Sequence, residues 1–254
     1  MLDDFILETS GLSKAFDGHV VVRGLELRVR RQHVHALIGP NGAGKTTVFN
    51  MLSKLLEPSS GRIRFKGEDI TATGPAQVAR RGLARSFQLC AVFPRLSALE
   101  NVRAALQRRH LPSFQFWRSE RVLHALDERA LALLDDVGLC EQAETPAADL
   151  PYGHKRALEV ATTLALDPDL VLLDEPTQGM GRDEIARVTG LIRKVAHRRT
   201  VVLVEHNMDV VADVADTISV LAGGKLLTEG NYAEVSRDAR VLEAYMGASE
   251  DSRA

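Results

Sequence analysis

The sequence is poor in cysteine and in aromatic residues, and it has no excess of either charge. Its two cysteines, Cys90 and Cys140, match no metal-ligand spacing, so we expect reduced thiols and no disulfide. Lysine and arginine number 32 against 34 aspartates and glutamates. This balance gives no general electrostatic attraction to nucleic acid, and a DNA or RNA partner is not expected.

Long hydrophobic runs are also missing. The first residues lack the basic segment and apolar stretch of a signal peptide, and no run reaches the roughly 18 apolar residues that a membrane span needs. We therefore expect a cytoplasmic protein, although its partner could lie in a membrane. The chain has 254 residues, 45% of them hydrophobic, which is enough for a substantial core and excludes a disordered or fibrous protein.

Strand patterns alternate with helical patterns along most of the chain. Two compact apolar runs, 170–173 and 200–204, are typical of buried parallel strands. Such alternation predicts an α/β fold. Further strand patterns cover 5–8, 20–29, 33–38 and 62–65, helical patterns cover 45–56, 76–81 and the stretch with Ile185, Val188, Ile192 and Val195, and a hairpin is expected at 218–227.

The stretch from about residue 97 to residue 150 has helical patterns only. Ser97 and Glu100 have the spacing of a capping box, which predicts that a helix begins there. An apolar stripe predicts a second helix, and its members are Leu123, Leu126, Ala130, Leu134 and Val137. We interpret this stretch as a helical insertion within the α/β core.

A phosphate-binding motif follows the third strand pattern and precedes a helix. Glycines allow backbone N–H groups to converge on phosphate oxygens, and the helix N-terminus adds positive potential. Lys45 is expected to reach the β and γ phosphates of a nucleotide, and the Thr46 hydroxyl to ligate Mg²⁺. An accidental glycine-rich turn would match in roughly one chain in a hundred. The segment is Gly39, Pro40, Asn41, Gly42, Ala43, Gly44, Lys45 and Thr46, and Thr47 extends the predicted nucleotide site.

Two carboxylates, Asp174 and Glu175, end the apolar run that begins at Leu170. This position places an acid beside the phosphate loop at the carboxyl edge of a parallel sheet. Asp174 would hold Mg²⁺, and Glu175 would polarise the attacking water in phosphoryl transfer. A solvated acidic turn is the alternative, which the upstream phosphate loop makes the weaker one.

With these motifs in this order, the chain resembles the ATP-binding-cassette (ABC) ATPase family over almost its whole length. The resemblance implies a P-loop core with an antiparallel β subdomain, and a helical subdomain inserted at about 89–166 of a single 1–254 domain. Gln88 matches the family's glutamine that touches Mg²⁺ or the attacking water and leads to the membrane-subunit surface. His206 matches the histidine that contacts the γ-phosphate. Phe16 matches the aromatic that stacks on adenine, with a core phenylalanine as the alternative.

The family's signature, usually Leu-Ser-Gly-Gly-Gln, corresponds to Leu150, Pro151, Tyr152, Gly153 and His154. Only Leu150 and Gly153 match, but the following segment has the family's helix about 20 residues before Asp174. In the family, this helix N-terminus covers the γ-phosphate of ATP held by an opposite subunit, which implies a second ABC ATPase subunit. Pro151 lacks both the hydroxyl and the N–H of the usual serine, and Gly181 stands where aspartate is common.

Several local segments resemble the ATPase subunits of branched-chain or hydrophobic amino-acid importers. That resemblance implies ATP hydrolysis coupled to import, permease subunits as partners, a solute-binding protein as an indirect one, and a place on the inner face of the cell membrane. Urea transport, lipid-linked glycan export and a soluble, non-transport ABC ATPase are the alternatives. The segments are Ala84–Gln88, Phe93–Pro94, Leu99–Val102, Tyr152, Gly179–Met180, Val204–His206 and Ala244–Gly247.

Overall fold

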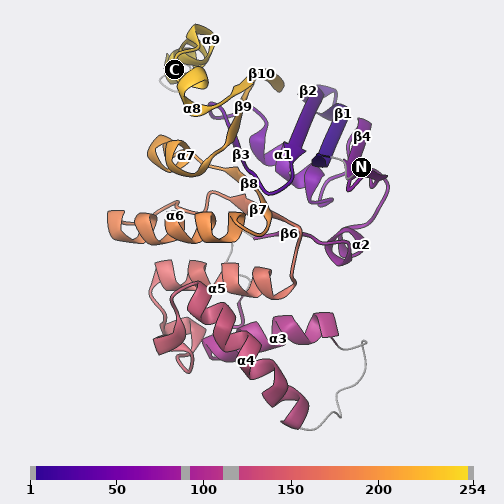
Figure 1. Ribbon diagram of the computed structural model, residues 1–254. Coiled ribbons are helices and arrows are strands. Elements are labelled where there is room, and N and C mark those ends of the chain that lie inside the picture. The colour runs from indigo at the N-terminus through magenta and orange to yellow at the C-terminus, as the bar shows by residue number, and fades with distance from the viewer. Residues whose placement is uncertain (1–3, 87–91, 111–119, 251–254) are drawn as a thin grey trace.

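The computed structural model describes residues 4–86, 92–110 and 120–250, and its strands form two sheets (Figure 1). The smaller sheet is antiparallel and has the strand order β2-β1-β4-β5. Its long pair, β1 and β2, buries apolar residues from both strands, and those of β2 alternate at Leu25, Leu27 and Val29. The strands are β1 (Phe5–Phe16), β2 (His19–Arg30), β4 (Ser60–Phe65) and β5 (Glu68–Asp69).

The larger sheet is the α/β core, with the order β10-β9-β3-β8-β7-β6. Its strands are parallel except for β10, which pairs with β9 in the expected hairpin. Every residue of β3, β7 and β8 is buried, as their continuous apolar runs predict. The strands are β3 (Val34–Ile38), β6 (Leu83–Arg85), β7 (Leu170–Asp174), β8 (Thr200–Val204), β9 (Thr217–Ala222) and β10 (Lys225–Gly230).

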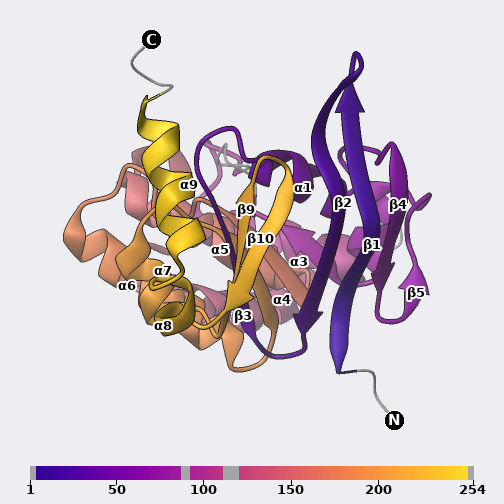
Figure 2. The same cartoon turned by 90° about the horizontal axis from the view of Figure 1, so that it is seen from above.

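The two faces of the larger sheet are covered by different elements, because side chains alternate along each strand. One face, with Leu37 and Leu172, packs against α1 and the antiparallel sheet. The other, with Ala36 and Val171, shares a core with α5, α6 and α7. Figure 2 shows the antiparallel sheet beside this core. The helices outside the insertion are α1 (Lys45–Leu52), α2 (Pro75–Arg80), α6 (Arg182–Ala196), α7 (Met208–Val214), α8 (Tyr232–Val235) and α9 (Ala239–Glu250).

Between β6 and β7 the described elements are helical, and Figure 1 shows them gathered at the end of the molecule away from the antiparallel sheet. The predicted capping box is confirmed: the Ser97 N–H donates to Glu100 Oε2 at 2.8 Å, and the Glu100 N–H donates to Ser97 Oγ at 3.1 Å. These features confirm the predicted fold class, and the boundaries 89–166 stay a prediction. The elements are α3 (Ala98–His110), α4 (Glu120–Asp136), α5 (Tyr152–Ala165) and two short 3₁₀ turns, η1 (Cys140–Gln142) and η2 (Ala147–Asp149).

Three details differ from the sequence-based expectation. The helix after the phosphate loop ends at Leu52 instead of residue 56, because Lys54 adopts a left-handed conformation with φ 62°. The first strand continues to Phe16 through several irregularities of pairing, which interrupt its alternation. The short strand β6 was not predicted, since three residues carry too little pattern. Within the described ranges, no helix is long and apolar enough to cross a membrane.

Candidate functional site

The phosphate-loop motif forms a tight connection between β3 and α1. Gly44 caps α1 with φ 98°, and a Cβ there would lie 3.1 Å from the carbonyl oxygen of Val21. Gly39 has φ 153°, and a Cβ there would lie 2.2 Å from the carbonyl oxygen of Leu221. These approaches require glycine at both ends of the loop. The first-turn N–H groups of α1 therefore follow directly on a loop pressed against β2 and β9.

Lys45 is 7% exposed and lies over this loop. Its Nζ donates to the carbonyl oxygens of Gly39 at 2.7 Å and Pro40 at 3.0 Å. Burial lowers the pKa of Lys45, and the charge of Glu175 opposes that shift. Phosphate oxygens would be stronger partners for this ammonium than two neutral carbonyls, because they add the attraction of a full negative charge. Thr46 is exposed and Thr47 half-buried beside it.

Asp174 ends β7 and is 1% exposed. Its Oδ2 accepts a hydrogen bond from Arg85 Nη2 at 2.6 Å, whereas its Oδ1 has no hydrogen-bond partner among the described residues. A buried carboxylate oxygen without a partner is unfavourable, and carboxylate and hydroxyl oxygens are ligands that Mg²⁺ prefers. The unpartnered Oδ1 of Asp174 therefore has the chemistry of a metal ligand, and Thr46 stays the second predicted ligand.

Arg85 is a component of the site that the sequence reasoning missed. Its Nη1 donates to Asn50 Oδ1 at 2.7 Å and to Ser53 Oγ at 3.0 Å, so it joins α1 to the end of β7. Its side chain is 8% exposed. No local pattern signalled this role, because β6 is too short to be recognised from the sequence and the partners of Arg85 lie 35 and 89 residues away in the chain.

Glu175 and His206 come together at the carboxyl ends of β7 and β8. Glu175 Oε1 lies 2.8 Å from His206 Nε2, with side-chain exposures of 12% and 45%. Glu175 has φ 47°, a conformation that is uncommon for a residue with a side chain and tends to occur at functional sites. The two residues expected to act on the attacking water and the γ-phosphate are therefore neighbours.

The signature segment begins α5. Pro151 occupies the cap position, and its carbonyl oxygen accepts the Lys155 N–H at 2.9 Å. The missing N–H of Pro151 is no loss to the helix, since the first helical N–H groups have no intrahelical partner. Pro151 and Tyr152 are exposed, whereas Leu150 and Gly153 are buried and His154 is half-buried.

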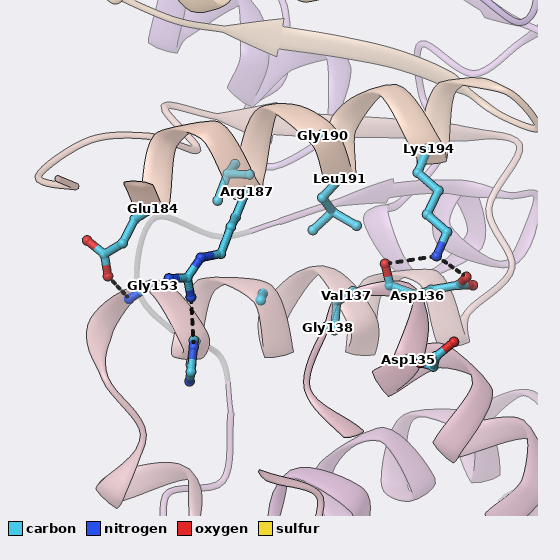
Figure 3. Close-up of a pocket in the computed structure, with 13 residues that line it drawn as sticks. Asp135, Asp136, Val137, Gly138, Gly153, Glu184, Arg187, Gly190, Leu191 and Lys194 are labelled. Atoms are coloured by element: carbon cyan, nitrogen blue, oxygen red, sulfur yellow. Dashed lines mark hydrogen bonds and ion pairs between the residues drawn. The ribbon is translucent and has the colours of Figure 1, made fainter. Parts of the chain in front are cut away.

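The N–H of Gly153 already has a partner, which the sequence reasoning did not foresee. It donates to Glu184 Oε1 at 3.1 Å, and the other carboxylate oxygen of Glu184 accepts the Gly181 N–H at 3.1 Å. Glu184 thus joins the signature helix to the start of α6. Figure 3 shows this contact across a cleft of about 290 Å³ between α5, α6 and the end of α4. Two further contacts cross the same cleft. Arg187 Nη1 lies 3.4 Å from His154 Nε2, and Lys194 Nζ forms an ion pair with Asp136 Oδ1 at 2.9 Å.

Of the remaining predicted residues, the structure describes Phe16 but not Gln88. Phe16, at the end of β1, is 43% exposed, so the alternative of a core phenylalanine is wrong. Lys14 Nζ lies 5.2 Å from its ring centroid. Gln88 falls outside the described residues, and its roles stay predictions.

Phe93 lies just after residue 92, where the described residues resume, and its side chain is 61% exposed. The buried Asn101 holds its segment: Asn101 Oδ1 accepts the Phe93 N–H at 2.7 Å, and Nδ2 donates to the Phe93 carbonyl at 3.1 Å. The same Nδ2 lies within hydrogen-bond distance of the carbonyl oxygens of Leu96 and Ser97. These hydrogen bonds fix the backbone that carries the exposed Phe93 ring.

Comparisons with known proteins agree with this arrangement. The family model described as "ABC transporter" matches residues 22–178, and that of the "Branched-chain amino acid ATP-binding cassette transporter" matches 225–251. The chain is similar to the high-affinity branched-chain amino acid transport ATP-binding proteins BraF of Pseudomonas aeruginosa and LivG of Salmonella typhimurium. BraF is 39% identical over 255 residues, and LivG is 34% identical over 254 residues; each alignment covers 95% of this chain and 98% of the relative.

Among solved structures, the chain is similar to the ADP conformation of MJ1267, an ATP-binding cassette of an ABC transporter. The TM-score is 0.83 at 25% identity, covering 96% of this chain and 99% of the other. These findings confirm the resemblance that the motifs indicate. The chain therefore belongs to the ABC transporter family and is one of its ATP-binding cassettes.

Proposed function

We propose that the chain is the ATP-hydrolysing subunit of an importer for branched-chain or other hydrophobic amino acids. The proposed ATPase activity rests on one observation: three functional groups lie at one edge of the larger sheet. These are the Lys45 ammonium on the phosphate loop, the unpartnered Oδ1 of Asp174, and the Glu175–His206 pair.

The chemistry is phosphoryl transfer to water, in which the protein mainly positions reactants and stabilises charge. Lys45 exchanges its carbonyl partners for phosphate oxygens, and the loop's N–H groups hold the remaining ones. Glu175 orients and deprotonates the attacking water, while His206 holds the Glu175 carboxylate and reaches the γ-phosphate. Magnesium, held by Thr46 and Asp174, would neutralise phosphate charge; Gln88 is the further proposed ligand. Phe16 would stack on the adenine.

The active unit we propose contains two cassettes, either two copies of this chain or this chain and a relative. The phosphate loop begins α1 on one face of the larger sheet, whereas the signature begins α5 in the core of the other face. Each ATP would lie between the phosphate loop of one cassette and Leu150–His154 of its partner. Two bound nucleotides would favour the closed pair, because only that state gives them both sets of contacts.

The membrane partner would dock on the rim around Leu89, Val92 and Phe93. The subunit would then lie against the membrane, and its proposed side is the inner face of the cell membrane. Of this rim, Val92 is half-buried and Phe93 exposed, and Leu89 lies outside the described residues. The fixed backbone at Asn101 would hold Phe93 for a helix of a permease subunit. A solute-binding protein would act further away, without contacting this chain.

Branched-chain amino acids are favoured over urea, an exported lipid-linked glycan or a soluble role by the family match at 225–251. That segment includes β10, α8 and α9 and lies beyond residues 22–178, which the general family model matches, so it separates this group from other ABC ATPases. The motifs at its end, Ala244–Gly247, point the same way.

The direct test is uptake in proteoliposomes that contain this subunit, the permease subunits and the solute-binding protein encoded with it. With ATP on the subunit's side, radiolabelled leucine should accumulate, and Phe93→Asp should abolish accumulation. The matched control is Leu242→Asp, which changes another exposed apolar residue, on α9 (52% exposed, against 61% for Phe93). ATP hydrolysis without accumulation of leucine, isoleucine or valine would contradict the proposed substrate class.

A further inference from the structure

Glu205, the residue before His206, is a buried carboxylate with four neutral donors. Glu205 directly follows β8 and is 3% exposed. One oxygen, Oε1, accepts the Thr177 N–H at 3.0 Å and also the Thr177 hydroxyl. The other, Oε2, accepts the N–H groups of His206 at 2.7 Å and Asn207 at 3.1 Å.

The two oxygens therefore hold two different loops. Thr177 belongs to the turn after Glu175, which leaves the end of β7, and this turn is only two residues from the proposed catalytic carboxylate. His206 and Asn207 begin the loop after β8, where Asn207 Oδ1 also caps α7 by accepting N–H groups of Asp209 and Val210. Because hydrogen bonds to an ionised acceptor are strong, both loops are fixed relative to one carboxylate.

The same two loops carry Glu175 and His206, whose side chains must lie at the right distance from each other for hydrolysis. Glu175 Oε1 and His206 Nε2 are 2.8 Å apart, and the Glu175 N–H also donates to the Val204 carbonyl at 2.9 Å. The His206 N–H donates to the Glu205 carboxylate, which fixes the backbone of His206, whereas the His206 side chain is 45% exposed. Misplacement of a reacting group by an ångström can lower a rate by about 10²-fold.

We propose that Glu205 is a positioning residue that sets the distance between Glu175 and His206 by tying their two loops together. This role rests on the proposed function, since it acts through the two residues assigned there. A carboxylate suits this role because both of its oxygens accept hydrogen bonds, so each loop needs to supply only donors. In Glu205→Gln one oxygen becomes an NH₂ group, which faces N–H donors whichever way the amide turns, and one loop is released.

The test compares steady-state ATP hydrolysis of the parent, Glu205→Gln, His206→Ala and the double variant, with ATP binding and melting temperature measured on each. Glu205→Gln should lower kcat about tenfold, with KM for ATP changed by less than about threefold. In the His206→Ala background, Glu205→Gln should have a smaller effect than in the parent, because the distance between Glu175 and His206 no longer has to be set.

Thr177 provides a milder variant in case Glu205→Gln fails to fold. Thr177→Val removes the hydroxyl that donates to Oε1 and should lower kcat by about threefold, whereas Thr177→Ser keeps the donor and should restore the parent kcat. Normal kcat in Glu205→Gln, or effects of Glu205→Gln and His206→Ala that multiply, would overturn the proposal and leave Glu205 as a structural cap. Absence of ATP hydrolysis in the parent would instead contradict the proposed function.

Discussion

His206 Nε2 and Glu175 Oε1 are 2.8 Å apart, although 31 residues separate them in the chain. The contact joins the ends of adjacent parallel strands, β7 and β8. It places a carboxylate and an imidazole beside Lys45, whose pKa responds to the charge of Glu175. An edge of this kind is where α/β proteins bind phosphates and perform their chemistry.

Lys45→Ala should abolish ATP hydrolysis and sharply weaken ATP binding, because a desolvated, charge-assisted contact with phosphate is lost. ATP binding and turnover of the purified subunit measure both effects. Lys225→Ala, an exposed lysine on β10, is the matched control and should behave like the parent. Turnover of the Lys45 variant near the parent value would show that the loop does not hold the phosphates.

Substitutions in the signature should differ greatly in effect. Pro151→Ser should change turnover by no more than about tenfold, because one neutral hydrogen bond is worth roughly 0.5 to 1.5 kcal/mol. Gly153→Asp should nearly abolish turnover, since its Cβ would lie 2.4 Å from Glu184 Oε1 and its charge would repel both Glu184 and an approaching phosphate.

Steady-state rates of these two variants, with the permease subunits present, check the ranking. Gly153→Ala separates bulk from charge, because it adds the Cβ without the carboxylate. A hundredfold gain in Pro151→Ser, or an active Gly153→Asp, would show that this surface does not close the site.

His35 makes the stability of the subunit depend on pH. Burial lowers its pKa from 6.5 to about 4, assisted by the nearby His33, and its Nε2 shares a hydrogen bond with the buried Ser219 hydroxyl at 2.8 Å. The unfolded chain therefore takes up this proton first, and stability is lost as the pH falls from about 6.5 towards 4. This single group lowers the free energy of unfolding by about 2 kcal/mol between pH 7 and pH 5.

Urea denaturation at pH 7 and pH 5 measures that difference. In His35→Gln the loss between the two pH values should shrink by about 2 kcal/mol, whereas His197→Gln, at an exposed position after α6, should leave it unchanged. Equal losses in the parent and in His35→Gln would contradict the assignment.

The parts of the fold and site that the sequence predicts are those with a local signal. The phosphate loop is a contiguous pattern between a strand and a helix, the Ser97–Glu100 capping box spans four residues, and Asp174 and Glu175 end an apolar run. In each case the residues that make the feature are neighbours in the chain, so their spacing alone indicates the contact.

The contacts that the sequence did not reveal join residues far apart in the chain. Asp174 and Arg85 are 89 residues apart, Gly153 and Glu184 are 31 apart, and Thr177 and Glu205 are 28 apart. Each depends on which strands become neighbours in the sheet and on how α6 packs over α5, and no local spacing encodes that.

The most direct test of the account is Glu175→Gln, which keeps the shape of the side chain and removes its charge. Size-exclusion chromatography with Mg-ATP should show that the variant forms a stable dimer, while its hydrolysis falls by roughly 10²-fold or more. Glu243→Gln, an exposed glutamate on α9, should hydrolyse ATP at the parent rate. Parent-like turnover of Glu175→Gln would contradict the assignment of Glu175 as the catalytic base. A variant that stays monomeric with Mg-ATP, both alone and mixed with the related cassette of its transporter, would contradict the proposed closure of two cassettes.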